Sequence, residues 1–134
     1  MAKSSIVMLT STAGQLNVTG QAIKGPGYFG YSRGILTTSI SVQNFVGRFY
    51  LQASLSTNPG PNDWFPLWLE GQNPYAQFPF DPNNPTGEYG GDTGNYAWTL
   101  QGNLVWIRAV VDRSYLPLPQ LADVGVLLTC LCNY

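Results

Sequence analysis

Residues 46–56 read VGRFYLQASLS, and this run sets the class of fold. Its apolar residues recur at every second position, which is the period of a β-strand with one buried face. The expected buried side chains are Phe49, Leu51, Ala53 and Leu55, and the expected solvent-facing ones are Arg48, Tyr50, Gln52, Ser54 and Ser56. No helical period fits this run, so it predicts a strand.

The same pattern continues on both sides of this strand. Apolar and polar residues alternate from Ile35 to Val42, and the runs at 64–69, 95–101, 104–113 and 124–132 are also strand-like. Glycine, proline and asparagine separate these runs. About eight short strands with turns every ten or so residues are typical of two packed antiparallel sheets. We therefore expect an all-β single domain over residues 1–134, an antiparallel β-sandwich resembling a jelly roll.

Two segments interrupt the alternation. Residues 73–95 contain four prolines, several glycines and several aromatic residues. An irregular segment of this length is uncommon in a compact domain and is usually functional, while a disordered linker would be poorer in aromatics. We expect a long ordered loop or arm that lies on its own domain or on a neighbour. Residues 116–134 are expected to form a C-terminal strand and tail.

The composition is poor in charge. Charged residues make up 10% of the chain and hydrophobic residues 44%, whereas an ordinary soluble domain has roughly 25% charged residues. Two interpretations fit equally well: a chain that packs against partners, or a large β core rich in aromatics. The net charge of -1 and six scattered basic residues offer no footprint for a phosphate backbone, so nucleic acid is not an expected partner.

The ends of the chain and its cysteines bear on location. The apolar run from Ile6 to Leu9 is too short for a signal peptide, and no stretch approaches the length of a membrane span. We therefore expect no membrane partner. Cys130 and Cys132 lie two apart on one face of a strand, where a disulfide would be strained. Reduced, buried thiols are expected, in keeping with assembly in a cytoplasm.

Residues suited to catalysis are scarce. The chain has no histidine, which removes the commonest general base and metal ligand. Four acids lie in or beside the aromatic loop and could in principle act as a carboxylate pair, but hydration of the loop explains them better: Glu70, Asp81, Glu88 and Asp92. The loop at Asp81 matches no full calcium motif and is expected to form an Asx turn. Arg108 and Arg113 are expected to anchor a local carboxylate such as Asp112, or a C-terminal group. We expect no enzyme activity, no cofactor and no metal.

Aromatic residues are the strongest candidates for a functional surface. They concentrate between residues 64 and 89, in the edge-like strand at 64–69 and in the loop that follows. The candidate interface residues are Trp64, Phe65, Trp68, Tyr75, Phe78, Phe80 and Tyr89. Such side chains bury well against another protein, and they can also stack on sugar rings. Protein contact and glycan binding therefore both remain open.

Four motifs of the chain resemble small structural proteins of tailed phages, notably cyanophages. In order they are a glycine-aromatic turn at 25–30, a strand FYLQASLS at 49–56, an Asp-Trp-Phe turn at 63–65 and the run GNLVWIRA at 102–109. The similarity touches most of the chain from Gly20 to Asp112. Residues 73–95 and 116–134 have no counterpart in that pattern.

The resemblance implies a component of the virion, assembled in the host cytoplasm. It would be a capsid decoration or cement protein, or an accessory protein of the tail, neck or baseplate. Its partners would be copies of itself, with a trimer as the favoured state, and phage capsid or tail proteins. The alternative is a glycan-binding β-sandwich module used in host recognition.

Overall fold

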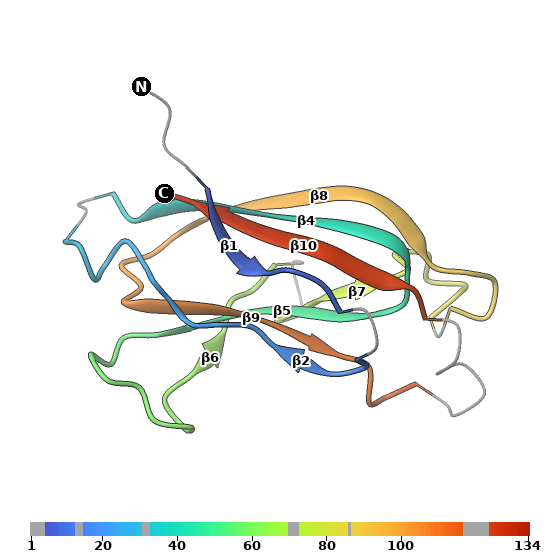
Figure 1. Cartoon of the computed structure of the whole chain (residues 1–134), viewed down its shortest axis with the longest axis horizontal. Coiled ribbons are helices and arrows are strands. Elements are labelled where there is room, and N and C mark those ends of the chain that lie inside the picture. The colour runs from blue at the N-terminus through green and yellow to red at the C-terminus, as the bar shows by residue number, and fades with distance from the viewer. Residues whose placement is uncertain (1–4, 13–14, 31–32, 70–72, 86, 117–123) are drawn as a thin grey trace.

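The computed structural model describes residues 5–12, 15–30, 33–69, 73–85, 87–116 and 124–134. These residues form two antiparallel sheets packed face to face (Figure 1). Sheet A has the order β1 (Ile6–Leu9), β10 (Val126–Asn133), β4 (Ile35–Phe45) and β8 (Asp92–Gln101). Sheet B is centred on β9 (Trp106–Asp112) and β5 (Gly47–Ser54). The short strands β2 (Val18–Thr19) and β3 (Ile23–Lys24) lie beside β9, and β6 (Phe65–Pro66) and β7 (Ala76–Phe78) lie beside β5. The predicted all-β sandwich is confirmed.

The strand order is that of a jelly roll. β2 and β3 both pair with β9, and β6 and β7 both pair with β5. When each pair is taken as one interrupted strand, the described residues form eight strand positions, and sheets A and B follow the orders 1-8-3-6 and 2-7-4-5. Successive long strands therefore alternate between the sheets, as in double-sheet jelly rolls.

The chain crosses from sheet A to sheet B at a sharp corner around Asn44. Asn44 adopts a left-handed conformation with φ of 47°, which asparagine tolerates better than most residues. Its backbone N–H donates to Thr93 Oγ1 at 2.9 Å, and its side-chain Oδ1 accepts from the Gly91 N–H at 2.8 Å. A Cβ on Gly91 would lie 2.4 Å from the Asn44 carbonyl oxygen. The corner thus requires glycine at Gly91 and fixes the start of β8 against the end of β4.

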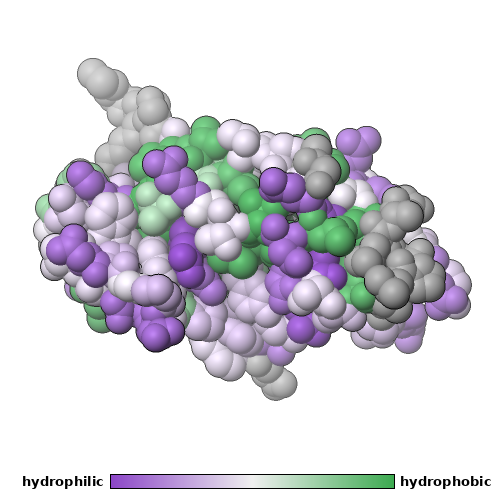
Figure 2. Space-filling model, turned by 60° about the horizontal axis from the view of Figure 1, so that its bottom comes forward, coloured by the Kyte–Doolittle hydropathy of each residue, from purple (hydrophilic) through white to green (hydrophobic). Residues whose placement is uncertain are grey.

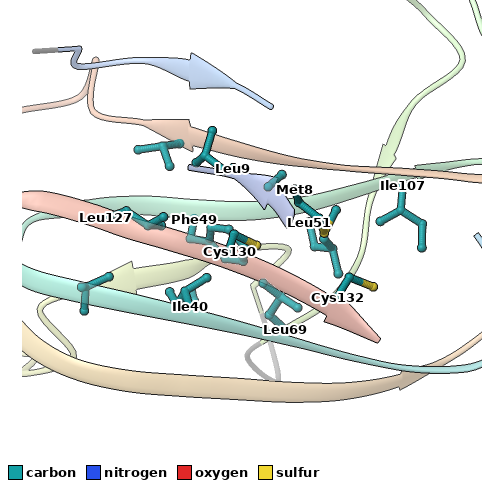
Figure 3. Packing of buried hydrophobic residues seen from close by; sticks show 14 of the residues in the cluster. Met8, Leu9, Ile40, Phe49, Leu51, Leu69, Ile107, Leu127, Cys130 and Cys132 are labelled. Carbon is teal, nitrogen blue, oxygen red and sulfur yellow. The ribbon is translucent and has the colours of Figure 1, made fainter. Parts of the chain in front are cut away.

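The core fills the space between the sheets. Phe49 and Leu51 of β5 and Ile107 of β9 meet Ile40 of β4 and Leu127 of β10, all at most 1% exposed; Figure 3 shows these side chains directed into one layer. The thiols of Cys130 and Cys132 are free and lie in the same layer, as the spacing predicts. Burial raises the pKa of the Cys130 thiol to about 12.

Arg113 is buried behind the end of β9, at 1% exposure. The prediction that it pairs with a carboxylate is wrong. Its guanidinium donates to the backbone carbonyls of Gln15, Leu16, Val124 and Gly125, at 2.8 to 3.1 Å. The side chain therefore ties the segment before β2 to the segment before β10, and Asp112 instead accepts from the N–H and Oγ of Ser114.

The segment at 73–95 is more regular than the sequence predicts. Ala76–Phe78 forms β7 on the edge of β5, and β8 begins at Asp92. Between them, Asn84 is buried and bonds the backbone of Tyr89 and Gly90. The described part of this segment therefore lies on its own domain, while Thr86 is outside the described residues. In the C-terminal segment β10 forms as expected, and residues 117–123 are outside the description.

Candidate functional site

The outer face of sheet A carries no charged side chain among the described residues. We call it the uncharged face. Its members project away from the core from all four strands of the sheet: Val7, Ile35, Thr37, Ser39, Ser41, Gln43, Thr93, Asn95, Ala97, Thr99, Gln101, Val126, Leu128, Thr129, Leu131 and Asn133. Hydroxyl, amide and aliphatic groups therefore make up the whole surface of this sheet.

The strand register places these residues in rows across the sheet. Val7, Leu131, Ser39 and Ala97 form one row, and Thr129, Ser41 and Asn95 form the next. In a third row Thr37 and Thr99 share a hydrogen bond of 2.9 Å between their hydroxyls. The side chains in these three rows are short or aliphatic, and Gln43 and Gln101 are the long flexible groups among the listed members of the face, so the entropic cost of covering the rows is low.

Apolar side chains are exposed on the same face. Val7, Ile35 and Leu128 are each 43 to 50% exposed, and they sit on three different strands. A charged group that is buried against a partner needs a counter-charge. Because the described residues of this face are uncharged, a partner can cover it without supplying one. Its chemistry therefore suits burial against another protein surface.

The outer face of sheet B is different, because arginines and aromatic rings occupy it. Arg108 of β9 donates from Nε to Gln52 Oε1 of β5 at 2.8 Å, and its guanidinium lies 4.2 Å from the centre of the Trp64 ring. Burial lowers the pKa of Arg108, but the group stays a cation at any ordinary pH. The three side chains form one connected cluster on the sheet.

Arg48 forms a second cluster at the other end of β5. Its guanidinium lies 4.6 Å from the centre of the Tyr75 ring and 4.2 Å from that of Tyr115, and its Nε donates to Gln77 Oε1 at 3.1 Å. The ring of Tyr50 packs on that of Tyr75 at 5.3 Å. Burial raises the pKa of Tyr115 to about 12, and its hydroxyl has no hydrogen-bond partner. Both arginines of this face thus find their partners within the same chain.

A shallow hollow of about 300 Å³ lies on the β2 side of this face. It is lined by Asn17, Val18, Thr19, Tyr50, Gln52, Val110, Val111 and Asp112. Figure 2, with the sheet B side turned forward, shows hydrophilic side chains over much of the surface and hydrophobic ones gathered in a band across it. The hollow combines amide, carboxylate and phenol groups, which are hydrogen-bonding groups that a polar ligand can use.

The candidate interface residues do not form one surface. Phe78 is in the core at 0% exposure, against Phe45 and Tyr96, and it cannot contact a partner. Trp64 and Tyr75 are half-buried in the two arginine clusters. The remaining residues are exposed: Phe65 at 38%, Phe80 at 43%, Trp68 at 59% and Tyr89 at 80%. Phe80 lies against Tyr96 of β8, with ring centres 5.2 Å apart.

The uncharged face is the feature that the sequence analysis missed. Its signal was present, because the solvent-facing positions of the runs at 35–43 and 93–101 are all uncharged. The significance of those positions depends on topology, since β4, β8 and β10 come from distant parts of the chain and become neighbours only in the folded sheet.

Two acids of the aromatic loop, Asp81 and Asp92, support its backbone. Asp81 Oδ1 accepts from the Asn83 N–H at 2.9 Å, which is the expected Asx turn, and Asp92 Oδ2 accepts from the Phe80 N–H at 2.9 Å. Glu70 is outside the described residues. Across the part of the chain that the structure describes, no three histidine, cysteine or acidic residues gather in a way that could hold a metal ion. In that same part, no helix has the length and hydropathy needed to cross a membrane.

Comparisons with protein-family models, with curated proteins and with solved structures found no match to the chain.

Proposed function

We propose that the chain is a structural protein of a tailed-phage particle that acts through protein–protein contacts. It would serve as a capsid decoration or cement protein, or as an accessory protein of the tail, neck or baseplate. The observation that carries this proposal is the uncharged face, a four-stranded surface on which no described residue is charged. Depletion of charge is the compositional mark of surfaces that become buried between proteins.

The size of this surface supports a contact role. Its four strands have 4, 8, 11 and 10 residues. With about 3.4 Å per residue and about 4.8 Å between strands, they cover about 540 Å². A partner of equal size would bring the buried total to about 1,100 Å², which passes the roughly 1,000 Å² that a biological interface should bury and lies just below the range of stable interfaces. Contacts of this size gain strength when many copies bind one lattice.

The fold is compatible with the proposal and does not decide it. Jelly rolls occur in viral capsid proteins and in lectins alike, and one fold hosts many functions. The buried free thiols of Cys130 and Cys132 suit assembly in a reducing host cytoplasm. In this proposal the partners are copies of the chain and capsid or tail proteins, without nucleic acid or membrane.

The test is to measure the mass of the purified chain by light scattering and then its co-sedimentation with stripped heads and tails of the phage that encodes it. The proposal expects saturable binding to one of these particles. A Ser39→Arg variant, which places a charge at the centre of the uncharged face, should bind much less. Thr19→Arg adds the same charge on sheet B and should bind like the native chain. Absence of binding to both particles would refute the proposal.

A glycan-binding module is the second candidate, and the sheet B side favours it. The hollow beside Tyr50 offers Asn17, Gln52 and Asp112 as hydrogen-bonding groups. Trp68, which follows β6, and Tyr89, in the loop before β8, are exposed aromatic rings that lie outside the lining of this hollow. This candidate expects a monomer that is retained on host polysaccharide. Retention that falls on Gln52→Ala but not on Ser39→Arg would favour glycan binding over particle assembly.

A further inference from the structure

Three of the four lateral edges of the sandwich are short or interrupted. Sheet A ends on one side at β1, which has four residues and a register shift between Val7 and Leu9. Sheet B ends on one side at β2 and β3, of two residues each, and on the other at β6 and β7, of two and three residues. Short, bulged and proline-containing edges, such as β6 with Pro66, are devices that prevent edge-to-edge pairing.

The fourth edge, β8, has a register shift only at its start, between Asp92 and Gly94, and lacks these devices over the rest of its length. It has ten residues, and its register with β4 is unbroken from Gly94 to Gln101. No charged residue and no proline occurs from Thr93 to Gln101. Among the described residues β8 pairs with β4 alone. A long, regular and uncharged edge strand is a template for another strand.

Alternate residues of β8 direct their backbone groups away from β4. Just beyond the strand, the Gly102 N–H donates to the Gly34 carbonyl at 2.8 Å. By the alternation of an antiparallel ladder, the even-numbered residues of β8 therefore bond β4, and the odd-numbered ones face outward. The hydroxyl contact between Thr37 and Thr99 agrees, because side chains are closer in the non-hydrogen-bonded pairs. Asn95, Ala97, Thr99 and Gln101 thus each present an N–H and a C=O at the edge.

Apolar side chains border the same edge. Tyr96, Trp98 and Leu100 pack against the core but are only half-buried. Phe80, 43% exposed, lies beside Tyr96. A strand added to β8 would cover part of these side chains, so pairing would bury apolar surface as well as form backbone hydrogen bonds.

We propose that β8 pairs antiparallel with β8 of a second copy of this chain, so that two sheets A join into one continuous sheet across a twofold axis. Four outward residues from each copy would form about eight backbone hydrogen bonds, within the range of a typical interface of about 10 ± 5. The inference deepens the proposed contact role and rests on it for its biological purpose. It also narrows the homo-oligomer to a dimer, in place of the trimer expected from the sequence.

A second copy is the occupant that the residues favour. The exposed side chains of β8 are Thr93, Asn95, Ala97, Thr99 and Gln101. Antiparallel pairing of this strand with itself therefore sets no like charges opposite each other, whereas a charged foreign strand would find no counter-charge. Because the other edges are short or interrupted, pairing stops at two copies and gives a closed, isologous assembly.

The experiment is sedimentation velocity of the purified chain from low to high micromolar concentration, with three variants. Ala97→Pro removes one outward N–H and leaves the bonds to β4 in place. Ala97→Lys adds a charge at the edge without changing the backbone. Gln43→Lys adds the same charge on the same face of β4, away from the edge, and is the matched control. Circular dichroism and the thermal midpoint of each variant check that it is folded.

The native chain and Gln43→Lys should dimerise with the same dissociation constant, and both Ala97 variants should raise that constant about tenfold or more. A native chain that stays monomeric, or a dimer that the Ala97 variants leave unchanged, would overturn the inference. A monomeric chain whose binding to phage particles is lost in Ala97→Pro, which adds no charge to the uncharged face, would assign the edge to a foreign strand instead. A dimer that ignores every particle would leave this inference standing and refute the proposed function.

Discussion

The outer faces of the two sheets are built on opposite principles. Sheet B displays arginines and aromatic rings that satisfy one another: Arg108 with Gln52 and Trp64, and Arg48 with two tyrosines. Sheet A displays small uncharged groups, with exposed aliphatic residues among them. The few charges of the chain are therefore unevenly distributed between the two faces. The arginines of the sheet B face have partners within the chain, while the uncharged face of sheet A is suited to burial against a partner.

The arginines on the surface of sheet B differ in role from the buried Arg113. The largest change in stability is therefore expected when Arg113 is replaced. Arg113→Met would leave four carbonyls without their donor, one in a buried hydrogen bond and three in part-buried ones, so we expect a loss of about 3 to 5 kcal/mol in the free energy of unfolding. Arg108→Met, at the surface of sheet B, should lose about 1 kcal/mol or less. Urea unfolding at neutral pH measures both. Equal losses would show that the sheet B arginines are as structural as Arg113.

The second prediction tests the two faces with the same added charge. Ser39→Arg on sheet A should weaken binding to the phage particle by about 2 kcal/mol, or about 30-fold, because an unpaired charge becomes buried. Thr19→Arg on sheet B should leave binding unchanged. Both variants should keep their stability within about 0.5 kcal/mol of the native chain. A matching loss in Thr19→Arg would remove the distinction between the faces.

The third prediction concerns the contact between the Arg108 guanidinium and the Trp64 ring on the outer face of sheet B. A double-mutant cycle with Arg108→Met and Trp64→Leu should give a coupling of about 0.5 to 1 kcal/mol, because the cation lies over the ring at a partly exposed site. Urea unfolding of the two single variants and the double variant measures it. Strictly additive losses would mean that the guanidinium and the indole are neighbours without interaction.

The smallest effect at neutral pH is expected at Tyr115. Tyr115→Phe removes a buried hydroxyl that has no partner and keeps the ring beside Arg48. We therefore expect stability at pH 7 to be unchanged or to rise by up to about 1 kcal/mol. Chemical unfolding at pH 7 is the measurement, and a loss above that size would reveal a hydrogen bond at this hydroxyl.

The same tyrosine and a core thiol should make the folded chain less stable at alkaline pH. The pKa values of Tyr115 and Cys130 are raised from 10.0 and 9.0 to about 12 in the folded state. Their neutral forms therefore stabilise the fold fully below pH 9, and this contribution is lost as the pH rises from 9 to 12. Stability measured across this range should fall, and less steeply in Tyr115→Phe above pH 10. A flat profile would contradict the burial of both groups.

Local alternation accounts for what the sequence could predict. The period of two located β4, β5, β8, β9 and β10, and the spacing of the cysteines placed both thiols on one buried face. The predicted end of β5 at Ser56 is wrong, because the strand stops at Ser54. The Oγ of Ser54 accepts from the Ser56 N–H, and the Ser54 carbonyl accepts from the Val105 N–H. Leu55 is therefore 63% exposed, although its spacing predicts burial.

Features that depend on tertiary pairing could not be predicted. β7 forms inside a proline-rich segment because the edge of β5 is available to it, and this pairing buries Phe78. Arg113 bonds carbonyls that are more than ten residues away in both directions. The uncharged face likewise arises only when strands from both ends of the chain become neighbours.

Thiol accessibility measures whether the uncharged face is the surface that partners cover. The native thiols are buried and nearly unionised, so they react slowly with maleimide. Single variants Ser39→Cys and Thr19→Cys then report the two faces separately. If partners cover the uncharged face, Ser39→Cys reacts in the free protein and is protected on the phage particle, while Thr19→Cys reacts equally in both states. Protection of Thr19→Cys with continued reaction of Ser39→Cys would contradict this role of the uncharged face.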